Sequence, residues 1–172
     1  MQFSRQAQEE GGNEIMMFAI TVAAIAGAGL VTGLHFAFPN FVMRALADLP
    51  EDKGMFAMQR INEKIINPVF LALFFGTPFL CSVIAVRSVL QWGHPGSLYL
   101  FVGAIAYLAG PLGITVLFNV PLNDKLAGAD LSSANDVWPE YQRLWQRWNH
   151  IRTYTGVLSV LFLATGAGIA EK

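Results

Sequence analysis

The sequence predicts an all-α fold, a four-helix transmembrane bundle, from its composition and from four apolar segments. Hydrophobic residues make up 54% of the 172 positions and charged residues only 13%, whereas about a quarter of a soluble domain is charged. The segments at residues 15–38, 69–86, 98–118 and 151–170 are nearly free of charge and long enough to cross a bilayer. Because backbone hydrogen bonds must close within each segment in lipid, all four should be helices.

The first span follows a polar, acidic N-terminal tail at residues 1–14, MQFSRQAQEEGGNE. A cleavable signal peptide would carry a basic region there, so we expect the span to be retained. Residues 15–172 then form a single transmembrane domain, because four spans leave too few residues for a separate soluble one.

The connections between the spans differ in length. QWGHPGS at residues 91–97 contains two glycines and a proline, which predicts a tight turn and an antiparallel hairpin of the second and third spans. The two longer connections should lie together on the opposite membrane side. There, residues 51–67 and 138–150 are expected to extend helices two and four above the bilayer.

Lys and Arg residues are divided unevenly between the two membrane sides. Eight of the eleven belong to the side of the long connections, and the other three are Arg5, Arg87 and Lys172. The positive-inside rule therefore places the long connections in the cytoplasm and both termini outside it, in the cell inner (plasma) membrane.

Composition also limits the class of function. The formal net charge is -1 and no basic stripe is present, so a nucleic-acid partner is not expected. There is no Cys/His cluster and no Glu-x-x-His pair, so no metal site is predicted. A haem with two histidine ligands would need His35 and His150, and no cofactor is assigned.

Helix four carries a polar stripe into the bilayer. At 100° per residue, one side of this helix presents Tyr141, Trp145, Trp148, Asn149, Arg152, Gly156 and Ser159. The opposite side presents Arg143, Arg147, His150 and Tyr154. A charged residue within a span is costly to bury, so Arg152 should have a partner helix or a ligand.

The other helices place polar residues at the same depth. Before helix two, one face collects Gln59, Asn62, Glu63, Ile66, Asn67 and Phe70, which predicts that Glu63 points inward. Helix three offers Thr115 and Asn119, with Asn123 just beyond them, and His35 lies about one turn before the end of helix one. This coincidence of depth predicts a site, with phenylalanines such as Phe70 and Phe74 as its apolar floor.

Each of these features has a purely structural alternative. Glu63 and Arg152 could form only an ion pair that clasps two helices. Asn119 and Asn149 could cap or bridge helices in lipid. The tryptophans, Trp138, Trp145 and Trp148, could form an interfacial aromatic belt. His35 could be a satisfied polar residue near a helix end.

Four ordered motifs carry a family resemblance. They are HFAFPNFVMRAL at residues 35–46, AMQRINEKIINPVF at 57–70, FNVPLNDKLA at 118–127 and W-x-x-W-N-x-x-R at 145–152. With these motifs the chain resembles the anthrone oxygenase-like family of small four-helix membrane proteins. The resemblance implies a four-helix membrane bundle and an oxidation of anthrones to anthraquinones by dioxygen without metal or flavin.

The implied chemistry assigns roles to the polar residues. His35 or Glu63 would be the base that removes a proton from an acidic carbon. Arg152, with Asn149 or Asn119, would stabilise the resulting oxyanion. Trp145 and Trp148 would stack on a flat polycycle. Further contacts to the substrate would come from Gln59, Asn62, Asn67 and Asn123.

The first hypothesis is therefore a membrane-embedded oxidoreductase-like enzyme, a cofactor-independent oxygenase acting on a lipophilic aromatic or quinone-like molecule. The second is a non-catalytic protein that binds haem, through His35, or a quinone or lipid at the same depth. The third is an accessory subunit of a larger membrane complex, or a homo-oligomer, with the glycine-rich helix faces as contact surfaces.

Overall fold

The computed structural model describes residues 2–170, and it describes the side chains of residue 8 and of residues 11–170. The first rod of the bundle is α1 (Gln2–Ala37), which continues through a π-helical turn, η1 (Phe38–Val42), into α2 (Met43–Ala47). The helix α1 thus includes residues of the segment predicted as a polar tail, where Gln, Arg, Ala and Glu favour helix.

The second rod is divided in two. Its parts are α3 (Glu51–Lys64) and α4 (Pro68–Leu90), which do not form one continuous helix. Asn67 has extended backbone angles and accepts a hydrogen bond from the backbone N–H of Phe70 at 3.1 Å, so it caps α4. Pro68 disfavours helical angles in the residue before it, which explains the break. The predicted extension of helix two is therefore helical but separate from its span.

The third rod comprises α5 (Ser97–Tyr107), a long π-helical segment, η2 (Leu108–Asn119), and α6 (Val120–Ala127). Pro111 lies inside η2 and cannot donate a backbone hydrogen bond, and prolines of this kind accompany shifts of helical register. After a short 3-10 turn, η3 (Leu131–Ser133), the fourth rod is the single helix α7 (Ala134–Ala170). Here the predicted extension of helix four is continuous with its span.

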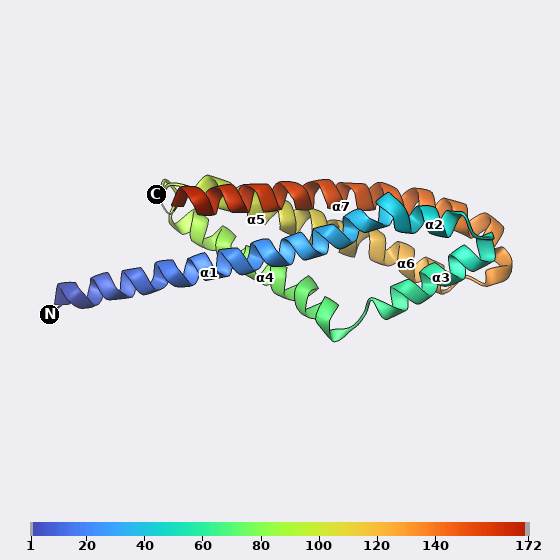
Figure 1. Ribbon diagram of the computed structural model, residues 1–172, viewed down its shortest axis with the longest axis horizontal. Coiled ribbons are helices and arrows are strands. Elements are labelled where there is room, and N and C mark those ends of the chain that lie inside the picture. Colours follow the sequence, from blue (N-terminus) through green and yellow to red (C-terminus); the bar gives the residue numbers. More distant parts are fainter. Residues whose placement is uncertain (1, 171–172) are drawn as a thin grey trace.

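These rods confirm the predicted fold class. Within the described residues, four helices are long and apolar enough to cross a membrane, at Gly11–Ala47, Pro68–Leu90, Ser97–Ala127 and Leu131–Ala170. We therefore describe the chain as a multi-pass membrane protein. Figure 1 shows the start of α1 and the end of α7 at one end of the bundle, and α2, α3 and α6 at the other.

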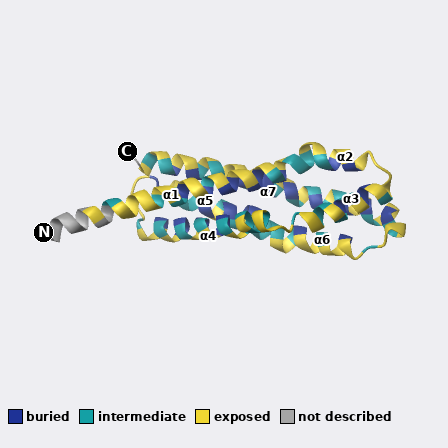
Figure 2. Ribbon diagram, turned by 60° about the horizontal axis from the view of Figure 1, so that its bottom comes forward, coloured by how far each residue is buried: buried dark blue, intermediate teal, exposed yellow. Residues whose placement is uncertain are grey.

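Two apolar cores fill the bundle. The membrane core joins residues of α1, α4, α5 and α7, among them Ala24, Ala28, Cys81, Tyr107 and Leu163. The extension core lies at the opposite end and includes Met43, Met55, Leu126, Trp138 and Trp145. Figure 2 shows buried residues along the inner faces of the helices in both halves. Along α1 and α7, the stretch between the two cores contains His35, Asn149 and Arg152.

Replacing Gly103 by alanine should weaken the contact between α5 and α7. A Cβ added there would lie 2.8 Å from the backbone nitrogen of Leu163, which cannot yield without a shift of the helix. We expect Gly103→Ala to lower the free energy of unfolding by about 1–3 kcal/mol, the usual effect of overpacking. Thermal unfolding in detergent measures this change.

The matched control is Gly33→Ala, because nothing lies within 4 Å of a Cβ added at Gly33. This variant should be neutral or more stable by up to about 1 kcal/mol, since alanine favours helix over glycine. Equal losses of stability in the two variants would contradict the packing between α5 and α7.

Candidate functional site

Arg152 is the only charged residue among the buried side chains that the structure describes. Its side chain is 5% exposed. One terminal nitrogen donates to Thr115 Oγ1 at 3.0 Å and the other to Asn149 Oδ1 at 2.6 Å. The guanidinium carbon lies 5.1 Å from the centre of the Trp145 ring, a cation–π distance. Within the described part of the chain, Arg152 forms no ion pair with a carboxylate.

Asn149 connects this arginine to α1. It is fully buried, and its amide nitrogen donates to the backbone carbonyl of His35 at 2.7 Å while its amide oxygen accepts from Arg152. His35 is itself 5% exposed, and its Nδ1 has no hydrogen-bond partner among the described residues. The Asn149 amide thus binds the backbone of α1 at His35 and also orients the guanidinium of Arg152.

Asn119 supplies a second contact from the third rod, beside that of Thr115. Its amide nitrogen donates to the backbone carbonyl of Trp145 at 3.3 Å, and its Oδ1 is buried without a partner among the described residues. Asn119 ends the π-helical segment η2 that also holds Thr115, and the π-helical turn η1 begins three residues after His35. Because π-helical insertions often occur at functional sites, their position beside these residues favours a site here.

Asn123 anchors a second group of polar contacts toward the extension core. Its Oδ1 accepts from Tyr141 Oη at 2.8 Å and from Trp145 Nε1 at 2.9 Å. Asn62 of α3 donates to the same tyrosine oxygen at 3.3 Å. The bond from Trp145 to Asn123 orients the indole ring over which Arg152 lies. Asn123 and Asn62 therefore contact Trp145 and Tyr141 rather than Arg152 itself.

The face of α7 predicted to point inward does so. Tyr141, Trp145, Asn149, Arg152, Gly156 and Ser159 are buried, and Trp148 is half-buried. The Trp148 ring stacks on Phe118 with 3.7 Å between centroids. The residues predicted to point outward are exposed, namely Arg143, Arg147, His150 and Tyr154.

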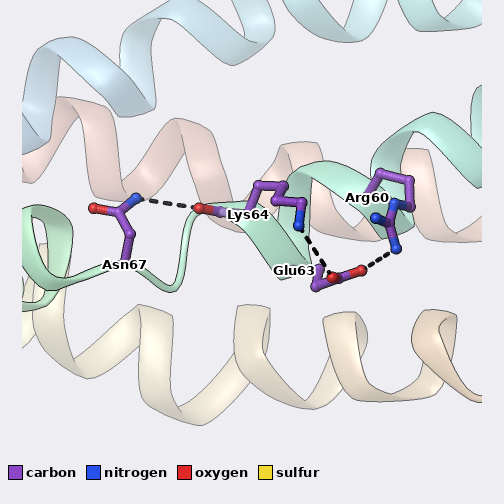
Figure 3. A network of polar contacts seen from close by, with 4 residues as sticks. All are labelled: Arg60, Glu63, Lys64 and Asn67. Carbon is purple, nitrogen blue, oxygen red and sulfur yellow. Dashed lines mark hydrogen bonds and ion pairs between the residues drawn. The ribbon is translucent and has the colours of Figure 1, made fainter.

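The prediction that Glu63 points inward is wrong. Its side chain is 53% exposed and pairs with Arg60 and Lys64 on the surface of α3, as Figure 3 shows. A Glu63–Arg152 ion pair is therefore not formed. The helical wheel failed here because it assumed one continuous helix from residue 59 to residue 70, whereas the chain breaks after Lys64 and α3 has its own rotation.

Two further predicted binding residues make structural contacts away from Arg152. Asn67 caps α4 and donates to the backbone carbonyls of Lys64, the contact drawn in Figure 3, and of Ile65. Gln59 donates to the carbonyls of Leu126 at 2.8 Å and Ala129 at 3.2 Å, which ties α3 to the end of α6. The structure does not bring either of them to the guanidinium.

Several buried polar atoms of the bundle are unpaired, at Arg152 and at other residues of the described chain. The described side chains contain five buried nitrogen or oxygen atoms without a partner: Thr32 Oγ1, His35 Nδ1, Asn119 Oδ1, Arg152 Nε and Ser159 Oγ. Buried polar groups are normally paired, so such a group of atoms calls for a ligand or bound water. Thr32 was not predicted, although its spacing of three residues from His35 puts both on one helix face.

A haem or metal role rests on His35 alone. The described residues contain no group of three His, Cys, Asp or Glu side chains able to hold a metal ion. His150, the second histidine that a bis-histidine haem would require, is exposed on the other side of α7. Of these two histidines, His35 alone is connected through Asn149 to Arg152.

Replacing Asn149 should destabilise the bundle, because it removes the acceptor of one terminal nitrogen of Arg152 and the donor to the His35 carbonyl, while Thr115 still accepts from the other nitrogen. We expect Asn149→Ala to lower the free energy of unfolding by about 1–3 kcal/mol, the cost of unpaired buried polar groups. Its neighbour His150 is exposed, so His150→Ala should change stability by less than about 0.5 kcal/mol. Thermal unfolding of the two variants in the same detergent measures the difference. Similar losses of unfolding free energy in both would refute the bridging role of Asn149.

The comparison with known proteins supports a family assignment. The family model for anthrone oxygenase matches residues 70–162, more than half of the chain. The matched stretch contains Thr115, Asn119, Asn149 and Arg152, whereas His35 lies outside it. No curated protein and no solved structure matches the chain. With a bundle of four apolar helices and this match, the chain belongs to the anthrone oxygenase family.

Proposed function

We propose that this protein is a membrane-embedded oxidoreductase, a cofactor-independent oxygenase that acts on a lipophilic aromatic or quinone-like substrate beside Arg152. The observation that carries the proposal is a buried guanidinium held by two neutral partners, Asn149 and Thr115, with no carboxylate paired to it among the described residues. A buried cation without a counter-charge is costly. A substrate that becomes an anion during the reaction would supply that charge.

The first chemical step is a proton transfer. A methylene carbon next to a conjugated ketone is acidic, because its conjugate base is an enolate with the negative charge on oxygen. His35 Nδ1, which is buried and has no hydrogen-bond partner in the described part of the chain, would accept the proton. The enolate oxygen would then receive hydrogen bonds from Arg152, and the charge interaction is strong because the surroundings are apolar.

The second step consumes dioxygen. The enolate gives up electrons to dioxygen, and a new carbon–oxygen bond forms a hydroperoxide at the former methylene carbon. Loss of the second carbon-bound proton then breaks the oxygen–oxygen bond, leaving a carbonyl group and one molecule of water. The carbon loses four electrons and dioxygen gains four, so each methylene group consumes one dioxygen. The Arg152 cation would hold each oxyanion formed along this sequence.

The aromatic residues and the bilayer would bring the substrate to this position. Trp148 and Phe118 stack at the half-buried edge of α7 and offer a flat apolar surface for a polycycle. A lipophilic substrate would partition into the membrane and arrive from the side. We also propose the inner (plasma) membrane as the location, with both termini outside the cytoplasm, because eight of the eleven Lys and Arg residues belong to the other side.

The test measures oxygen uptake and anthraquinone formation with an anthrone substrate in nanodiscs. Arg152→Ala should lower kcat/KM by about 10²–10³, the loss seen when one oxyanion donor is removed. His35→Ala should lower it by about 10²–10⁴, the contribution of a general base. One dioxygen should be consumed for each quinone formed.

Arg143→Ala is the matched control, because Arg143 is an exposed arginine of the same helix. It should retain the activity of the unaltered protein. Equal losses in Arg143→Ala and Arg152→Ala would refute the proposed site, and so would binding of an anthraquinone at Arg152 without any turnover of the anthrone.

A further inference from the structure

A groove lies at the end of the bundle farthest from α3 and α6. It has a volume of about 570 Å³ and is bounded by the first part of α1, the last turn of α4, the turn before α5 and the end of α7. Figure 1 shows α1 diverging from the rest of the bundle toward its N-terminus. Pockets of about 300–1,000 Å³ are typical of sites for small organic ligands.

The rim of the groove carries charges of both signs. Glu14 comes from α1 and Arg87 from the last turn of α4, and both line the groove. Among the described side chains, neither takes part in an ion pair. A cation and an anion that are both available at one rim would match a ligand that carries both charges itself.

The wall below the rim is apolar. Phe18 of α1, Ile84 of α4, Leu100 of α5 and Ala167 of α7 each lie about one helical turn farther into the bundle than the rim. Three hydroxyl groups also line the groove, and each donates to a backbone carbonyl. Thr21 donates to Met17 at 2.8 Å, Ser88 to Ile84 at 2.8 Å and Ser97 to Gln91 at 3.0 Å. Their oxygens therefore remain free to accept hydrogen bonds.

We propose that this groove binds one membrane phospholipid whose headgroup carries a primary amine. The phosphate would accept hydrogen bonds from Arg87, and the ammonium group would donate to Glu14. The upper part of an acyl chain would pack along the apolar wall, and the remainder would lie in the bilayer. The groove opens where α4 ends and α5 begins, which is where a transmembrane hairpin meets the headgroup layer.

The charge pattern favours this occupant over other lipids. An anionic headgroup without an amine would place negative charge near Glu14. A choline headgroup has no N–H and cannot donate to the carboxylate. A free phosphate would leave the apolar wall exposed to water. The groove is also separate from Arg152, so this proposal does not depend on the proposed oxygenase activity.

The experiment counts bound lipids by native mass spectrometry. The protein is reconstituted with equal amounts of phosphatidylethanolamine, phosphatidylcholine and phosphatidylglycerol, then transferred to a mild detergent. The unaltered protein should retain one phosphatidylethanolamine. Arg87→Gln should lower the retained fraction of all three lipids about tenfold, as expected on losing one charge-assisted hydrogen bond. Glu14→Gln should remove the preference for phosphatidylethanolamine over phosphatidylcholine.

Two exposed charges at the other end of the bundle provide controls, Arg44→Gln and Glu51→Gln. Both should retain the lipid as the unaltered protein does. Ala167→Phe keeps every charge but fills the apolar wall, so it should expel the lipid even if Arg87→Gln fails to fold. Retention in Ala167→Phe, equal retention in Arg87→Gln and Arg44→Gln, or a peptide in the groove instead of a phospholipid would overturn the proposal.

Discussion

The position of Arg152 is the constraint on which the rest of the bundle depends. A guanidinium that is 5% exposed within a membrane span must be surrounded by hydrogen-bond acceptors. Thr115 of the third rod and Asn149 of α7 supply them, and Asn149 also reaches the carbonyl of His35 on α1. Three of the four rods therefore meet at one charge, and their relative rotation is fixed there by directional bonds rather than by apolar packing alone.

The two apolar cores explain why the polar cluster can exist between them. The membrane core at Ala28 and Leu163 and the extension core at Met43 and Trp138 are both closely packed. They hold the rods together on either side of Arg152, so that the side chain stays buried. The π-helical segments η1 and η2 lie beside this layer. A π-helical turn contains an extra residue and so rotates the side chains that follow it, and η2 itself contains Thr115 and Asn119.

The sequence correctly predicted which side chains are buried along an uninterrupted helix. The prediction was wrong where a break separates two helices. Along α7 a rotation of 100° per residue separated buried Asn149 and Arg152 from exposed Arg147 and His150, because that helix has no break from residue 134 to residue 170. The same rotation misplaced Glu63, because Pro68 ends the regularity that the wheel assumed. Glu63 also lies beyond the apolar span, where water and surface cations stabilise its carboxylate. It therefore does not need Arg152 as a partner.

The two proposed sites differ in the charge that each offers to a ligand. At the Arg152 layer a single cation is enclosed by neutral amides and rings, so a ligand is favoured only when it brings a negative charge. At the opposite groove Arg87 and Glu14 lie at an open rim, where water screens both and a zwitterion can satisfy them. A lipid held there would brace α1 against α4. Since α1 carries His35, an ordered α1 would in turn keep the histidine in register with Arg152.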